Sequence, residues 1–126
     1  MDEIKVLLVE DNPVDAFMVR AALERSSSAT FTVDSADRLD TAITRAVSTP
    51  PDVLLLDLGL PDVQGLETFV RARAALANLP ILVLSGHDDE EVAIQSVQQG
   101  AQDYLLKGAT MKEMLPRAIR RVIKSA

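Results

Sequence analysis

Five polar residues directly follow four apolar runs of this sequence, and their side chains could together receive a phosphoryl group. They are Glu10 and Asp11, Asp57, Ser85 and Lys107. Each apolar run is typical of a buried strand, and the carboxyl ends of parallel strands line the crevice in which open sheets bind ligands. The sequence therefore predicts an acidic pocket that also holds one hydroxyl and one ammonium group.

The three carboxylates of this pocket would repel one another, and without a cation one of them would stay protonated. Hard oxygen ligands in this number favour Mg²⁺, with Mn²⁺ as the alternative. Once the charge is balanced, Asp57 is ionised and nucleophilic, and phosphoryl transfer then needs mainly positioning and charge neutralisation. We expect the metal, Lys107 and the Ser85 hydroxyl each to contact one phosphoryl oxygen of an aspartyl phosphate.

Apolar runs alternate five times with helical patterns, which predicts an α/β domain with a parallel sheet and helices on both faces. Three of the runs are continuous, as in strands that are covered on both sides. Phe31 and Val33 instead alternate with polar residues, as in an edge strand. The predicted strands are 4–9, 30–34, 52–57, 80–85 and 103–107.

The intervening helices have recognisable starts. Asn12 before Pro13 is a strong N-terminal signal, and Asp88 with Glu91 three residues later is a capping-box pattern that starts the fourth helix. Apolar residues at helical spacing predict the buried faces of the first three helices. These residues are Val14, Met18 and Ala21, then Leu39, Ile43, Ala46 and Val47, then Leu66, Phe69 and Val70.

Pro116 interrupts the pattern of the fifth helix, which otherwise starts near Thr110. A proline inside a helix costs about 3 kcal/mol or kinks the chain. Either the helix begins at Pro116, or residues 110–115 form a separate turn that leads into it.

Composition indicates an ordinary globular domain that spans residues 1–126. No apolar stretch approaches the ~20 residues that cross a bilayer. The N-terminus lacks the basic region of a signal peptide, and there are no cysteines. We expect a cytoplasmic protein without membrane insertion, and the net charge of −6 argues against direct binding to nucleic acid.

The chain resembles the receiver domain of a two-component response regulator over essentially its whole length. The resemblance implies a flavodoxin-like (βα)5 fold, which is a doubly wound five-stranded parallel sheet with strand order 2-1-3-4-5. The matching motifs are Val9-Glu10-Asp11-Asn12-Pro13, Leu56-Asp57-Leu58-Gly59-Leu60-Pro61-Asp62, Ser85-Gly86 and Gly100-Ala101-Gln102-Asp103-Tyr104-Leu105-Leu106-Lys107.

The resemblance also implies the roles of the acidic residues. Asp57 would be the phosphoacceptor, with the phosphoryl group supplied by a histidine kinase or a histidine phosphotransfer protein. Asp11, Asp57 and the backbone carbonyl of Gly59 would ligate the metal directly, and Glu10 would do so through water.

A switch pair is implied as well, beside Lys107 as the cation that binds the phosphoryl group. Ser85 would move toward that group and the ring of Tyr104 would turn inward. The change would alter the face made by the fourth helix, the fifth strand and the fifth helix, where a downstream protein target would bind. Without the family context, Tyr104 could equally be a half-buried strand residue.

A basic stripe follows helical spacing near the C-terminus, formed by Arg117, Arg120, Arg121 and Lys124. It could dock an acidic partner, or it could join two copies in a homodimer by pairing with Asp103 or Glu91. A solvated face is the alternative interpretation.

Three positions depart from the common family pattern. Gly108 stands where many relatives have a proline after a cis peptide, and we predict a trans Lys107–Gly108 bond because a cis bond before a non-proline residue is costly. Gly59 offers no side chain to shield an acyl phosphate, and His87 follows Ser85 by two residues. We predict that Gly59 and His87 modulate hydrolysis; otherwise His87 is an exposed loop residue.

These inferences predict a stand-alone signalling phosphoprotein rather than an enzyme, whose only reactions are phosphorylation and dephosphorylation of Asp57. If residue 126 is the end of the protein, its output must be through protein contact. One alternative is a receiver-like protein-binding module that works without phosphorylation. Another is a hydrolase of the haloacid dehalogenase type, although that chemistry needs a second aspartate where Gly59 stands.

Overall fold

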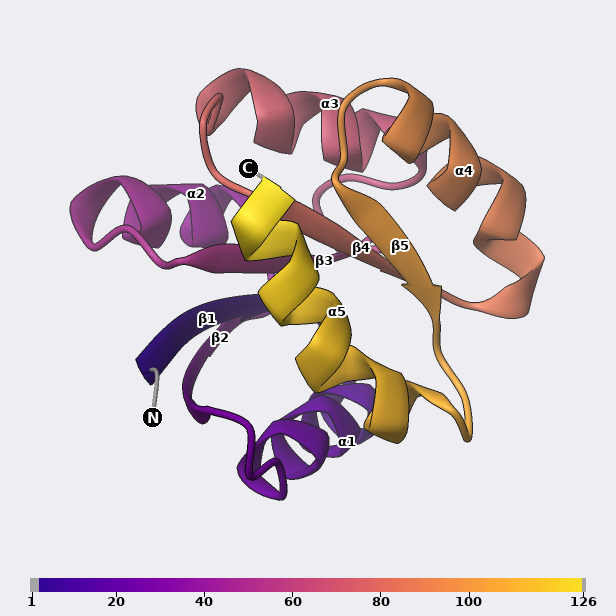
Figure 1. Ribbon diagram of the computed structural model, residues 1–126. Coiled ribbons are helices and arrows are strands. Elements are labelled where there is room, and N and C mark those ends of the chain that lie inside the picture. Colours follow the sequence, from indigo (N-terminus) through magenta and orange to yellow (C-terminus); the bar gives the residue numbers. More distant parts are fainter. Residues whose placement is uncertain (1–2, 126) are drawn as a thin grey trace.

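Five parallel strands form one sheet in the order β2-β1-β3-β4-β5 in the computed structural model, which describes residues 3–125 (Figure 1). This confirms the predicted fold class and strand order. The edge position of β2 agrees with the alternation of Phe31 and Val33, which are only partly buried. The strands are β1 (Glu3–Val9), β2 (Thr30–Ala36), β3 (Val53–Asp57), β4 (Ile81–Ser85) and β5 (Asp103–Leu106).

Helices cover both faces of the sheet. Figure 1 shows α1 and α5 on one side, and α2, α3 and α4 on the other. The helices are α1 (Pro13–Glu24), α2 (Leu39–Ser48), α3 (Leu66–Ala75), α4 (Glu90–Gln98) and α5 (Met111–Ser125), and a short 3₁₀ helix, η1 (His87–Asp89), precedes α4. No helix within residues 3–125 is both long enough and apolar enough to cross a membrane.

Two hydrophobic cores result from the alternation of side chains along the strands. In β3, Leu54 and Leu56 pack under α2 and α3, whereas Val53 and Leu55 pack under α1 and α5. All four side chains have no exposed surface. Continuous apolar strands are thus required because both faces are covered, and the first polar side chain of β3 is the one that leaves the core, Asp57.

The start of α4 differs from the prediction. Asp88 lies inside η1, where the N–H of Asp89 donates to the carbonyl of Gly86 at 3.1 Å, and α4 begins only at Glu90. No side chain caps either of these helices. The capping-box prediction was therefore wrong, because a 3₁₀ turn already uses the backbone groups that the box would have satisfied.

Both predictions for Pro116 were wrong, because α5 runs through it from Met111 to Ser125. The proline removes only the N–H that would bond to the carbonyl of Lys112, an exposed residue in the first turn that solvent can reach. Pro116 is itself buried on the apolar face of α5, beside Leu115 and Ile119. That burial offsets the lost hydrogen bond.

Some residues on the predicted apolar helix faces are exposed. Val14 is 65% exposed and Val47 is 66% exposed, while Val19 of α1 and Ala42 of α2 are fully buried instead. Val70 of α3 is also exposed. Other predicted residues, such as Leu39 and Phe69, are buried, so apolar spacing alone located the buried faces only in part.

Candidate functional site

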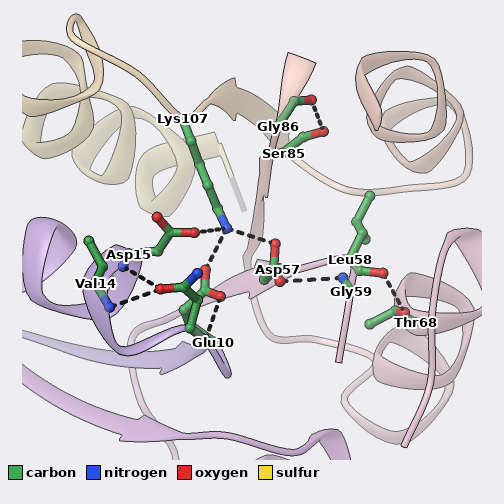
Figure 2. Close-up of polar contacts among 11 residues, drawn as sticks. Glu10, Val14, Asp15, Asp57, Leu58, Gly59, Thr68, Ser85, Gly86 and Lys107 are labelled. Atoms are coloured by element: carbon green, nitrogen blue, oxygen red, sulfur yellow. Dashed lines mark hydrogen bonds and ion pairs between the residues drawn. The ribbon is translucent and has the colours of Figure 1, made fainter. Parts of the chain in front are cut away.

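The five polar residues that follow the strands converge at the carboxyl edge of the sheet. Glu10 and Asp11 follow β1, Asp57 ends β3, Ser85 ends β4 and Lys107 follows β5. The parallel register pairs Asp57 with Leu84, and Ser85 with Leu106, so neighbouring strands end at the same level. Figure 2 shows Lys107 reaching down to the carboxylates from this edge.

An acidic cluster is formed by Glu10, Asp11 and Asp57. One carboxylate oxygen from each lies within 4.8 Å of the others. Glu10 is buried, Asp57 is half-buried and Asp11 is exposed. Three hard oxygen donors at this spacing, with one side open to solvent, fit a small divalent cation that keeps several water ligands.

Burial is the main influence on the two inner carboxyl groups. It raises the pKa of Asp57 and the pKa of Glu10 above their ordinary values, although Lys107 opposes the change in both. Neighbouring carboxylates raise both pKa values further: Asp57 raises the pKa of Glu10, and Asp11 raises the pKa of Asp57. The apo site thus carries more negative charge than its surroundings stabilise, which a cation would correct.

Lys107 contacts three carboxylates at once. Its Nζ lies 2.6 Å from Glu10 Oε2, 3.0 Å from Asp15 Oδ2 and 3.0 Å from Asp57 Oδ1. Although burial opposes its charge, these contacts raise the pKa of Lys107 above its ordinary value. The lysine is therefore a fixed cation beside Asp57, as the sequence predicted.

Asp15 was not predicted as a site residue. It lies in the first turn of α1, three residues after Asn12, whose side chain accepts from the backbone N–H groups of Val14 and Asp15. The available signal was an acidic residue in a helix turn that starts at the carboxyl edge of the sheet. Acidic residues are common in the first turn of a helix because they interact favourably with the helix dipole, so this signal does not distinguish a site residue.

The predicted switch residues lie apart from the acidic cluster. Ser85 is buried, and its hydroxyl donates to the carbonyl of Gly86 at 2.9 Å rather than to Asp57. The Tyr104 hydroxyl donates to Glu90 Oε2 at 3.0 Å, which holds it against the start of α4. His87 is exposed at the start of η1, and the described residues give it no hydrogen bond or ion pair with the site.

The backbone after Asp57 folds back against the site. The N–H of Gly59 donates to Asp57 Oδ2 at 3.4 Å, and the N–H of Gly65 donates to the carbonyl of Leu58 at 2.7 Å. Gly65 has a φ of 71°, which favours glycine at this turn before α3. The part of the chain from residue 3 to 125 has no cis peptide, so the predicted trans Lys107–Gly108 bond is confirmed.

A family model of the response regulator receiver domain matches residues 6–119. This chain belongs to that family. The KDP operon transcriptional regulatory protein KdpE of Escherichia coli is 36% identical over 119 residues, which are 92% of this chain and 51% of KdpE. The sensor histidine kinase TmoS of Ectopseudomonas mendocina is 35% identical over 118 residues, which are 92% of this chain and 12% of TmoS.

Solved receiver domains share the flavodoxin-like fold of this receiver domain. The signal receiver domain of the response regulator NarL from Mycobacterium tuberculosis superposes with a TM-score of 0.82 at 28% identity over 100% of both chains. A receiver domain protein from Clostridium thermocellum has the same fold with a TM-score of 0.82, at 22% identity over 97% of this chain and 95% of that one. The present chain spans about half the length of the KdpE regulators it matches.

Proposed function

We propose that this receiver domain is a phosphorylation-switched signalling module in which Asp57 accepts a phosphoryl group from a phosphohistidine. The donor would be a histidine kinase or a histidine phosphotransfer protein. One carboxylate oxygen of Asp57 forms the new bond to phosphorus while the phosphorus–nitrogen bond of the donor breaks. The electron pair of that bond returns to the imidazole, and the product is an aspartyl phosphate.

The observation that carries this proposal is that Asp57 contacts the ammonium group of Lys107 and also belongs to the acidic cluster, which could hold a metal ion. Its Oδ1 lies 3.0 Å from Lys107 Nζ, while a carboxylate oxygen of the same residue lies within 4.8 Å of ligand atoms of Glu10 and Asp11. Phosphoryl transfer needs this neutralisation of charge more than it needs acid–base chemistry. Lys107 supplies one positive charge from the protein itself.

We propose Mg²⁺, with Mn²⁺ as a substitute, as the cofactor of the acidic cluster. Asp11 and Asp57 would hold it directly, Glu10 through water, and the Gly59 carbonyl would complete the set. When bound, the ion neutralises phosphoryl oxygens and keeps Asp57 ionised. The raised pKa values of Glu10 and Asp57 support the need for a cation.

The output would pass through the face made by α4, β5 and α5. After phosphorylation, the Ser85 hydroxyl would turn from the Gly86 carbonyl to a phosphoryl oxygen, and the Tyr104 ring would leave Glu90. A downstream protein, or a second copy of this chain, would read the new face. Arg121 of the basic stripe already pairs within the chain with Asp103 at 3.0 Å, so a homodimer through this pair would have to exchange that contact.

A protein donor also needs a surface on which to dock. Val14 and Phe17 are 65% and 69% exposed on α1, one turn apart, and they flank Asp15 in the sequence. We propose this apolar pair as part of the donor contact. The domain itself would turn over no separate substrate, since it reacts only at Asp57.

The test is uptake of phosphoryl groups from acetyl phosphate with Mg²⁺, followed by intact mass spectrometry. We expect one added phosphoryl group on the wild type and none on Asp57→Asn. Asp52→Asn is the matched control, because Asp52 lies just before β3 at the opposite end of the strand and should react like the wild type. Uptake by Asp57→Asn at the wild-type rate would refute the assignment, and no uptake by the wild type would favour a module that works without phosphorylation.

A further inference from the structure

The ammonium group of Lys107 already contacts three carboxylates before any phosphoryl group arrives. An ammonium group has three N–H donors. In this structure Nζ donates hydrogen bonds to Glu10 at 2.6 Å and to Asp15 at 3.0 Å, and it forms an ion pair with Asp57 at 3.0 Å. A new contact with a phosphoryl oxygen must therefore replace or weaken one of these three.

Asp15 differs from the other two partners of Lys107. Glu10 and Asp57 belong to the acidic cluster, and Asp15 lies outside it. Figure 2 shows the carboxylates of Asp15 and Asp57 on opposite sides of the ammonium nitrogen. Asp15 thus draws the positive charge toward α1, away from the place where a phosphoryl group would form.

Asp15 is not needed to deliver Lys107 to the site. The backbone N–H of Lys107 donates to the carbonyl of Ser85 at 2.8 Å, which fixes the residue at the end of β5. Glu10 is buried and holds the ammonium group through its shortest contact, at 2.6 Å. The lysine would remain directed at Asp57 if the charge of Asp15 were removed.

The pair also has room to separate. Asp15 and Lys107 line a groove of about 270 Å³ between α1 and the segment that joins β5 to α5. The side chain of Asp15 is 32% exposed, whereas that of Lys107 is 19% exposed. Asp15 can therefore lose its partner to a phosphoryl group and be solvated, which Glu10 cannot.

We propose that Asp15 is a positioning residue that competes with the phosphoryl group for Lys107. Asp15 thereby weakens the binding of phosphoryl donors and destabilises the phosphorylated form of the domain. The inference rests on the proposed function. Two effects act in the same direction: Asp15 shares the lysine's charge, and its own negative charge repels the incoming phosphoryl dianion.

The test measures the affinity for beryllofluoride, an analogue of the phosphoryl group, by calorimetry with Mg²⁺ present. Asp15→Asn should bind the analogue about fivefold more tightly than the wild type, as expected for the loss of a partly exposed ionic contact. It should also lower the acetyl phosphate concentration that gives half-maximal phosphorylation. The affinity for Mg²⁺ alone should change much less, because Asp15 lies outside the acidic cluster.

Two variants serve as controls. Asp15→Glu keeps the charge and should bind the analogue more like the wild type than like Asp15→Asn. Glu24→Gln removes one negative charge from the exposed last turn of the same helix, and it should leave the affinity unchanged. A gain of affinity confined to Asp15→Asn cannot result from a damaged fold.

A crystal structure of the wild-type complex with beryllofluoride tests whether Lys107 moves from Asp15 to the analogue. The distance of 3.0 Å between Lys107 Nζ and Asp15 Oδ2 should lengthen as the lysine turns to fluoride. An unchanged distance beside a complete fluoride contact, or an unchanged or weaker affinity in Asp15→Asn, would overturn the inference while leaving Asp57 as the acceptor. If the wild type itself binds no analogue and takes up no phosphoryl group, both proposals fall.

Discussion

The hydroxyl of Tyr104 donates a hydrogen bond to Glu90 Oε2 at 3.0 Å, which ties β5 to the first turn of α4. The contact joins the predicted switch residue to the helix whose position the switch is expected to change. The contact raises the pKa of the Tyr104 hydroxyl above its ordinary value. The Glu90 carboxylate accepts a hydrogen bond from the protonated hydroxyl, and its negative charge would repel a tyrosinate. The position of the partly buried ring is thus stabilised by a specific partner.

Glu90→Gln should lower the pKa of Tyr104 toward the ordinary tyrosine value. Alkaline titration of ultraviolet absorbance measures this cleanly, because Tyr104 is the only tyrosine of the chain. Glu91→Gln is the control, since Glu91 is the exposed neighbour of Glu90. Equal titration curves for the wild type and Glu90→Gln would mean that the hydrogen bond does not hold the ring in solution.

Asp62 should stabilise the fold because it caps the N-terminus of α2, although it lies 23 residues after Leu39 in the sequence. Its two carboxylate oxygens each accept a backbone N–H at 3.1 Å, from Leu39 and from Asp40, at the start of α2. Asp62→Ala should cost about 1 kcal/mol of the free energy of unfolding, as for the loss of an N-cap. Urea unfolding of the two proteins measures the difference, and Asp37→Ala, an exposed aspartate before the same helix, is the control.

The stability of the metal-free protein should fall as pH rises through the raised pKa values of Glu10 and Asp57. Burial favours the protonated form of both groups in the folded state. Their contribution is therefore complete below the unfolded carboxyl pKa of about 4 and is lost on ionisation above the folded value.

Asp57→Asn removes one of these charges, so it should melt a few degrees higher than the wild type at neutral pH without Mg²⁺, at about 3 °C for each kcal/mol recovered. Added Mg²⁺ should raise the melting temperature of the wild type more than that of Asp57→Asn or Asp11→Asn. A full Mg²⁺-induced rise in Asp11→Asn would contradict the predicted metal site.

Gly59 and His87 should influence the lifetime of the aspartyl phosphate. A Cβ at Gly59 would meet Asp57 Oδ2 at 3.9 Å, an ordinary contact, so Gly59→Asn should fold and place a polar side chain beside the acceptor. The comparison is the decay rate of phosphorylated wild type, Gly59→Asn and His87→Ala under the same conditions. Equal decay of all three would mean that other residues control the lifetime.

The sequence by itself determined the sheet, its edge strand β2 and the residues at the ends of the strands. This was possible because a strand covered on both faces must be continuously apolar, and the first polar residue after it marks the edge of the core. Parallel strands then bring those polar residues together, so the sequence alone assigns Glu10, Asp11, Asp57 and Lys107 to one site.

Only the tertiary structure decided which side chains meet across that edge. Asp15 contacts Lys107 across 92 residues, and Asp62 caps α2 from the loop after β3. Local sequence patterns report neighbours one helical turn or one strand position apart, whereas these contacts depend on how helices and loops pack on the sheet. The same packing buries Pro116 inside α5, so the local cost of a helical proline did not decide the outcome.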